Sequence, residues 1–307
     1  MDVEQLKSLL RNNGIKPNFT YGQNFLIDEF VLQDIADAAK VTKEDNVLEI
    51  GPGVGNLTRV LAERAGFLLS VEKDPKFFQI LHNVKKDFKD NFRFEISDAL
   101  EFNFLEVFRS RSADVSGSAD GHGKGDRQFS AGPDGVLSSG SDLHYKVVAN
   151  IPYYITGKIL KMLMYAKIKP ESVTILTQKE VAQNVCAKPG NLSVLAISVQ
   201  LFGVPELVAP VLARSFYPAP KVDSAILKIT LDKTPRYKLA DEKKFFKIVK
   251  ACFAGKRKQI HNTMTNNLGL DKTRALEILN QLKIKPTSRP QELSIEQWVE
   301  LVDLISN

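Results

Sequence analysis

The stretch VLEIGPGVGNLT, residues 47–58, holds the features that decide the fold of this chain. The apolar run NVLEI at 46–50 predicts a buried strand, and the apolar pattern of 57–65 predicts a helix. Three glycines separate the two elements, at positions Gly51, Gly53 and Gly55. Glycines in a strand-to-helix turn let the backbone approach a ligand at the carboxyl end of a sheet. The stretch therefore predicts a ligand-binding loop.

Strands and helices alternate on both sides of this unit. An amphipathic segment beginning at Asp2 and another at 29–39 predict two helices before it. The further predicted strands are 67–72, 92–97, 145–150 and 172–178. Continuous apolar strands separated by helices are typical of a parallel sheet covered on both faces. We therefore expect a Rossmann-like α/β unit over residues 1–231.

One segment breaks this alternation. Between Ser110 and His144, 15 of 35 residues are Gly or Ser, and large apolar side chains are scarce. Such a segment buries too little surface to offset its ordering entropy. We expect residues 110–144 to be a disordered insertion, with a functional loop as the alternative.

The last quarter of the chain predicts a small all-α domain. The pattern turns helical after Leu231, and SRPQELSIEQW contains a capping box from Ser294 to Gln297. The expected helices are 241–253, 257–267, 271–281 and 294–305. Residues 232–307 hold 15 Lys and Arg against 9 Asp and Glu, whereas residues 1–231 are balanced at 27 each. A basic module beside a neutral one indicates a polyanionic partner, although basic surfaces are often simply solvated.

Composition argues against several other classes of protein. Cys186 and Cys252 form no CxxC or CxxH pattern, which argues against a disulfide scaffold and a zinc site. No apolar run is long enough to cross a bilayer, and the amino terminus lacks the pattern of a secretion signal. We expect a cytoplasmic protein without a metal.

Two acidic residues follow later strands of the predicted sheet. Glu72 ends the second strand and could accept hydrogen bonds from ribose hydroxyls, and Asp98 follows the third and could accept one from an adenine amino group. Both also fit a simpler interpretation as helix N-caps. Nicotinamide dinucleotides and S-adenosylmethionine suit such a set, but Asn56 stands where the dinucleotide motif needs Gly or Ala. The order of glycine loop, Glu72 and Asp98 favours S-adenosylmethionine.

The segment NIPYYITG, at 150–157, predicts an amine-binding site at the end of the fourth strand. The Asn150 side-chain oxygen and the Ile151 carbonyl could accept both N–H groups of an exocyclic amine and direct its lone pair at a methyl donor. Pro152 fixes φ, so that the two acceptors converge. Tyr153 offers a flat face for a flipped-out base. The alternative is an ordinary strand exit with an interfacial tyrosine pair, and Tyr154 is assigned to packing.

With these residues placed, the chain resembles the adenine-N6 dimethyltransferases of ribosomal RNA, of the bacterial type that acts on 16S rRNA. The resemblance covers nearly the whole chain apart from the insertion, which lengthens a connection that is shorter in the family. It rests on seven motifs: GQNFLID (22–28), VLEIGPGVGNLT (47–58), NIPYYIT (150–156), LTQKEVAQNV (176–185), FYPAPKVDS (216–224), FAGKRKQIHNTM (253–264) and SRPQELSIEQW (288–298).

The resemblance implies a fold, a cofactor and a substrate. The fold is a class I methyltransferase sheet, and the substrate is a pair of adjacent adenines near the 3′ end of small-subunit rRNA, each dimethylated. S-adenosylmethionine would contact six residues: Asn24, Leu26, Gly51, Glu72, Asp98 and Asn150. Without the family, Asn24 and Leu26 fit equally well as packing residues. We expect a monomer when the protein is free.

The resemblance also assigns residues to the RNA. It puts Phe216 beside the target base, although FYPAPKVDS by itself predicts only a rigid connection before a strand. Lys256, Arg257 and Lys258 would hold phosphates, whereas an isolated basic triplet is more often a solvated face. The alternatives are a related resistance methyltransferase of the large subunit and a non-catalytic ribosome-assembly factor.

Overall fold

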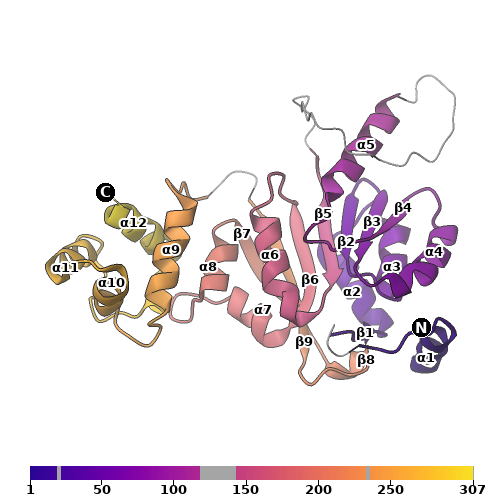
Figure 1. Cartoon of the computed structure of the whole chain (residues 1–307), viewed down its shortest axis with the longest axis horizontal. Coiled ribbons are helices and arrows are strands. Elements are labelled where there is room, and N and C mark those ends of the chain that lie inside the picture. The colour runs from indigo at the N-terminus through magenta and orange to yellow at the C-terminus, as the bar shows by residue number, and fades with distance from the viewer. Residues whose placement is uncertain (19–21, 118–142, 233–235, 307) are drawn as a thin grey trace.

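The computed structural model describes residues 1–18, 22–117, 143–232 and 236–306. Its centre is a seven-stranded sheet in the order β4-β3-β2-β5-β6-β9-β7 (Figure 1). The strands are β2 (Asn46–Ile50), β3 (Phe67–Glu72), β4 (Phe92–Ile96), β5 (Lys146–Asn150), β6 (Ser172–Gln178), β7 (Gly203–Val211) and β9 (Ser224–Leu231). The α/β class predicted from the alternation is confirmed.

The sheet is mostly parallel, as expected. Strands β4, β3, β2, β5 and β6 are parallel to one another, but β9 pairs antiparallel with both β6 and β7. The sequence pattern did not predict β7. This strand contains Pro205 and Pro210, which are tolerated here because β7 lies at the edge of the sheet.

Helices cover both faces of the sheet. The helices of the first 231 residues are α1 (Val3–Asn12), α2 (Glu29–Ala39), α3 (Asn56–Arg64), α4 (Phe78–Asp87), α5 (Phe104–Gly117), α6 (Thr156–Met164), α7 (Lys179–Val185) and α8 (Val194–Gln200). Leu48 of β2 faces a core shared with α5, α6 and α7, whereas its neighbour Val47 faces one shared with α2 and α3. Successive residues of one strand therefore pack against helices on opposite faces of the sheet.

Helix α5 corrects the predicted insertion. It continues to Gly117, so residues 110–117 are helical rather than disordered. Phe104 and Phe108 of this helix are buried against Tyr145, and Arg111 lies over the Phe67 ring at 4.4 Å. The apolar anchors lie before the Gly/Ser-rich stretch, which is why composition alone did not indicate the helix. The remainder of the predicted insertion, 118–142, lies outside the described residues.

The carboxyl-terminal helices lie together at one end of the molecule (Figure 1). They are α9 (Glu242–Phe253), α10 (Ile260–Leu268), α11 (Lys272–Gln281) and α12 (Ile295–Ser306), packed around Trp298. The predicted Ser294–Gln297 capping box is present. Helix α10 begins three residues later than expected, which leaves the basic triplet in a turn. Helix α8 contributes side chains to this core as well as to the sheet, so the boundary at residue 231 stays a prediction.

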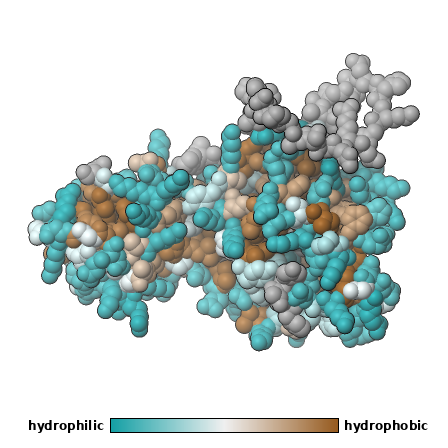
Figure 2. Space-filling view, viewed as in Figure 1, coloured by the Kyte–Doolittle hydropathy of each residue, from teal (hydrophilic) through white to brown (hydrophobic). Residues whose placement is uncertain are grey.

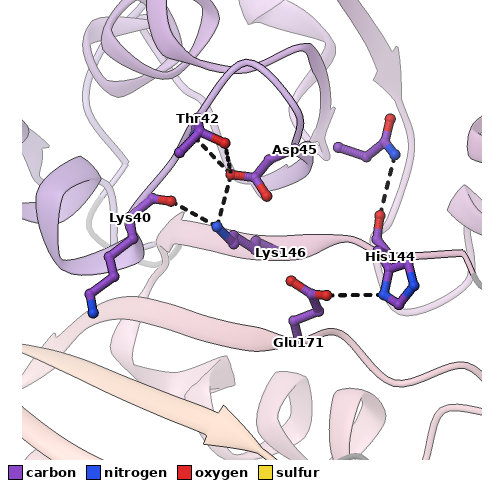
Figure 3. A network of polar contacts seen from close by, with 7 residues as sticks. Lys40, Thr42, Asp45, His144, Lys146 and Glu171 are labelled. Atoms are coloured by element: carbon purple, nitrogen blue, oxygen red, sulfur yellow. Dashed lines mark hydrogen bonds and ion pairs between the residues drawn. The ribbon is translucent and has the colours of Figure 1, made fainter.

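Strand β5 is held at its start by a polar network (Figure 3). The Lys146 Nζ donates to Asp45 Oδ2 at 2.8 Å and to the Lys40 carbonyl at 2.7 Å, and Asp45 also accepts from Thr42. Both charged side chains are only 15% exposed. This network fixes the strand that carries Asn150 at its other end. Among the helices that the structure describes, none is both long and apolar enough to span a membrane.

Candidate functional site

A cavity of about 240 Å³ opens at the carboxyl end of the sheet. Strands β2, β3 and β5 end there, at Ile50, Glu72 and Asn150, and the loop after β4 adds Asp98. Because parallel strands place their carboxyl ends on one edge, these segments converge although they are far apart in the sequence. Gly51 and Gly53 of the predicted ligand loop line this cavity, together with the two acids and the predicted amine-binding residues.

The glycine loop has the backbone conformation that only glycine adopts easily. Gly51 and Gly53 have φ of 73° and 55°. A Cβ on Gly53 would lie 3.4 Å from the Phe25 ring, so the loop and the amino-terminal segment approach closely. The Gly53 N–H donates to Glu72 Oε2 at 3.0 Å. Glu72, at the end of β3, therefore joins the glycine loop to that strand.

Glu72 is buried at the edge of the cavity, and each of its two oxygens accepts one backbone hydrogen bond. Its second oxygen accepts from the Asp74 N–H at 2.8 Å. Burial raises the pKa of this carboxyl, and the backbone donors oppose the shift. The carboxylate is therefore held in one orientation, with lone pairs left over for a ligand hydroxyl.

Asp98 is more open than Glu72. One oxygen accepts from the Leu100 N–H at 3.0 Å, as in a capping turn, and the other from Lys73 Nζ at 2.8 Å. The Lys73 hydrogen bond holds the pKa of Asp98 below its usual value. Asp98 thus caps a turn and not a helix, because the next helix begins at Phe104, and it also lies in the cavity lining.

Asn150 ends β5 directly beside the glycine loop. A Cβ on Gly51 would lie 3.8 Å from the Asn150 carbonyl oxygen, and Ile151 is buried behind it. No hydrogen bond engages the Asn150 side-chain amide within the part of the chain that the structure describes. The amide therefore has its donors and acceptor available to a ligand in the cavity.

The two tyrosines of NIPYY differ in their surroundings. Pro152 leads into a short 3₁₀ turn, Tyr153–Ile155. Tyr153 is half-buried, and its hydroxyl lies 2.7 Å from Ser224 Oγ. The side chain of Tyr154 is 63% exposed, so its assignment to packing was wrong. The 3₁₀ turn directs the Tyr153 ring inward and leaves Tyr154 exposed, and the sequence pattern of a strand exit did not predict this difference.

The amino-terminal segment closes the cavity by pairing with a distant part of the chain. Strands β1 (Phe25–Leu26) and β8 (Phe216–Tyr217) form a small antiparallel sheet in which Leu26 pairs with Phe216. Both of these side chains are buried and line the cavity. Asn24 lies in the same lining, with its amide donating to the Gly22 carbonyl at 3.3 Å.

Two residues of the site were missed in the sequence. Asn56 donates to the Leu26 carbonyl at 2.8 Å and so ties helix α3 to β1. Glu49 lines the cavity while buried under α3, where Ser70 donates to one oxygen at 2.5 Å and the other has no partner among the described residues. Burial raises the pKa of Glu49 to about 7. A carboxyl inside the apolar run NVLEI is the signal that could have identified it.

The predicted phosphate contacts lie apart from this cavity. Lys256, Arg257 and Lys258 are exposed on the turn between α9 and α10, at the end of the molecule formed by the helical part (Figure 1). The space-filling view shows a largely hydrophilic surface with scattered apolar residues on both parts (Figure 2). Any ligand that contacts both the triplet and the cavity must be large.

Comparisons with known proteins agree with this geometry. The model of the ribosomal RNA adenine dimethylase family matches residues 14–307. A ribosomal RNA small subunit methyltransferase A from Dehalococcoides mccartyi strain CBDB1 is 37% identical over 299 residues, covering 97% of this chain and 92% of the relative. A protein of the same name from Clostridium botulinum strain Okra is 35% identical, covering 97% and 98%.

Two solved structures resemble the chain over most of its length. The 23S rRNA methyltransferase ErmE is 25% identical with a TM-score of 0.66, covering 92% of this chain and all of that one. A dimethyladenosine transferase from Plasmodium falciparum is 23% identical with a TM-score of 0.68, covering 90% and 95%, and this likeness concerns the fold.

Proposed function

Because the chain belongs to the ribosomal RNA adenine dimethylase family, we propose that it transfers methyl groups from S-adenosylmethionine to the N6 amines of two adjacent adenines near the 3′ end of small-subunit rRNA. The observation that carries this proposal is the meeting of Asn150 with Gly51, Glu72 and Asp98 in one cavity. The residues that suit a methyl donor and the residue that suits a target amine therefore line the same cavity.

The residues present fit S-adenosylmethionine. Gly51 and Gly53 leave room for a ligand to approach the loop, and Glu72 and Asp98 provide acceptors for hydroxyl and amino groups. Asn24 and Leu26 would cover the ligand from the amino-terminal segment. The partnerless oxygen of buried Glu49 adds a further polar group to the lining of the cavity. When bound, the cofactor supplies an electrophilic methyl group.

Asn150 and Ile151 would prepare the target amine. The lone pair of an adenine amine is delocalised into the ring and is a poor nucleophile. Acceptance of its two N–H groups by Asn150 Oδ1 and the Ile151 carbonyl would favour a tetrahedral nitrogen with a directed lone pair. As the new N–C bond formed and the S–CH3 bond of the sulfonium broke to release the thioether product, the nitrogen would become acidic and lose one proton to water, so no strong base is required.

Aromatic side chains would hold the flipped base. Tyr153 and Phe216 both line the cavity, and Pro152 fixes the backbone before the Tyr153 turn. Stacking of a base on an aromatic ring contributes roughly 1–3 kcal/mol. The hydroxyl of Tyr153 is bonded to Ser224, which restricts the ring to one orientation. Lys256, Arg257 and Lys258 would hold phosphates farther along the RNA.

The small subunit is favoured over the large one as the source of the substrate. The relatives that are 35–37% identical carry the name small subunit methyltransferase A, whereas the ErmE structure, a 23S rRNA methyltransferase, is 25% identical. Methylation of 23S rRNA is the second candidate, because the structural match covers the whole length of ErmE and 92% of this chain.

Nucleoside mass spectrometry tests the proposal. Unmethylated small and large subunits are incubated separately with S-adenosylmethionine and either the wild type or Asn150→Ala. We expect N6-dimethyladenosine only in small-subunit RNA and only with the wild type, while the variant still binds subunits. Product in large-subunit RNA would establish the second candidate. Binding by the wild type without any methylated adenosine would leave a non-catalytic assembly factor.

A further inference from the structure

Tyr154 is an exposed aromatic residue at the mouth of the cavity. Its side chain is 63% exposed, yet it contributes to the cavity lining. The residue directly before it, Tyr153, lies deeper and is hydrogen-bonded to Ser224. Two consecutive tyrosines thus stand at two depths of the same opening, one fixed inside and one facing outward.

The Tyr154 ring is supported from the protein side. A Cβ on Gly22 would lie 3.8 Å from Tyr154 Cδ1 and 3.2 Å from Pro152 Cβ, so the Gly22 backbone lies against this turn. Gly22 has φ of 60°, a conformation that suits glycine and leaves no side chain to cover the ring. Tyr154 is therefore braced without being buried.

Other apolar side chains are exposed on the segment 212–224, which a hydrogen bond joins to the Tyr153 turn. The Tyr153 hydroxyl is hydrogen-bonded to Ser224, and the Ala213 N–H donates to Asp223 Oδ1 at 3.0 Å, so the segment that contains Leu212 and Val222 is connected to the turn. These two side chains are 45% and 47% exposed. Arg214 and Lys221 are exposed on the same loop, and neither has an ion pair with a residue that the structure describes. An exposed aromatic ring on a surface that also carries apolar side chains and cations suits an unpaired nucleotide.

We propose that Tyr154 is a stacking platform for the base next to the adenine that enters the cavity. The inference rests on the proposed function and deepens it: Tyr153 receives the target base and Tyr154 its neighbour. A substrate with two adjacent adenines places one purine just outside the opening whenever the other is inside. A purine offers the larger π-surface, so Tyr154 makes the enzyme select the base beside its target as well as the target itself.

A double-mutant cycle, in which Tyr154 is changed in the protein and the neighbouring base is removed from the RNA, measures the energy of this contact through binding affinities. The probe is an RNA hairpin with two adjacent adenines in its loop, and a second hairpin has an abasic site in place of the neighbour. For the wild type we expect loss of the neighbouring base to weaken binding by roughly 5- to 100-fold. For Tyr154→Ala the two hairpins bind alike, and Tyr154→Phe restores the difference because it keeps the ring.

A spectroscopic readout separates stacking from general loss of structure. With 2-aminopurine as the neighbour, the wild type and Tyr154→Phe quench its fluorescence and Tyr154→Ala does not. Phe30→Ala is the matched control, since Phe30 is 84% exposed but outside the cavity lining, and it leaves the binding difference intact. A Tyr154→Ala protein that still distinguishes the hairpins, or a wild type that does not, overturns the proposal. The cycle measures binding and not methyl transfer. A wild-type protein that stacks the neighbouring base but transfers no methyl group would therefore refute the proposed function and leave this contact standing.

Discussion

The Asn56 side chain donates to the Leu26 carbonyl at 2.8 Å, which joins the first turn of helix α3 to the short strand that covers the cavity. One hydrogen bond thus ties the helix that follows the glycine loop to the segment that covers the cavity. Asn56→Ala removes a bond worth about 1 kcal/mol. We expect the dissociation constant for S-adenosylmethionine, measured by calorimetry, to rise about fivefold. Asn91→Ala removes two side-chain bonds to backbone carbonyls, those of Ala62 and Ala65, but outside the cavity lining; it serves as control and should leave the dissociation constant unchanged.

Glu49 should make stability depend on pH. Burial raises its pKa from 4.5 to about 7, so between these values the native protein keeps a proton that the unfolded chain has lost. The free energy of unfolding is therefore highest below about pH 4.5 with respect to this group and falls as pH rises to 7. Glu49→Gln cannot ionise, and at pH 8 it should be more stable than the wild type by up to about 3 kcal/mol.

Urea denaturation at pH 5 and pH 8 measures this difference. The exposed Glu101 provides the control, because Glu101→Gln should follow the wild type at both pH values. Identical pH dependence in Glu49→Gln and the wild type would contradict an ionisable role for Glu49.

The Lys146–Asp45 pair should stabilise the protein more than its surface ion pairs do. Either Lys146→Met or Asp45→Asn leaves a largely buried group without its partner, and we expect each to lower the free energy of unfolding by about 2 kcal/mol. The double variant should lose less than the sum of the two. Arg59→Met breaks the more exposed pair with Asp87 and should cost less than about 0.5 kcal/mol. Additive losses at Lys146 and Asp45 would show that the pair is not coupled.

The basic turn between α9 and α10 should contribute salt-dependent RNA affinity. Changing Lys256, Arg257 and Lys258 to alanine removes up to three phosphate contacts. We expect the slope of log K against log salt concentration for subunit binding to decrease by about 2–3. The matched variant changes Lys85, Lys86 and Lys89, which are equally exposed near the end of α4, and should retain the wild-type slope. Equal slopes in all three proteins would show that the basic triplet makes no phosphate contacts and is simply solvated.

The sequence predicted the parts of the site that depend on local pattern. Strand ends are readable because apolar runs stop at Ile50, Glu72 and Asn150, and parallel strands bring such ends together. The Leu26–Phe216 pairing and the Asn56 bond involve residues distant in the chain, and no local pattern encodes them. The orientation of Tyr154 depends on a 3₁₀ turn that the pattern of a strand exit does not reveal.

Helix boundaries and edge strands were the weaker predictions for a related reason. Helix α5 is anchored by Phe104 and Phe108, but its last turn lies in the Gly/Ser-rich composition that predicted disorder. Strand β7 is held by its pairing with β9, which outweighs the two prolines that disfavour a strand. In both cases tertiary contacts override local propensity.

The pairing of β1 with β8 has a consequence for biosynthesis. A ribosome makes residues 25–26 early, but their partners at 216–217 emerge only after six of the seven strands of the main sheet have been made. During translation the glycine loop and its acids can therefore assemble while the cavity is still uncovered on the amino-terminal side. The newly made protein therefore acquires its complete cavity only after residues 216–217 have emerged.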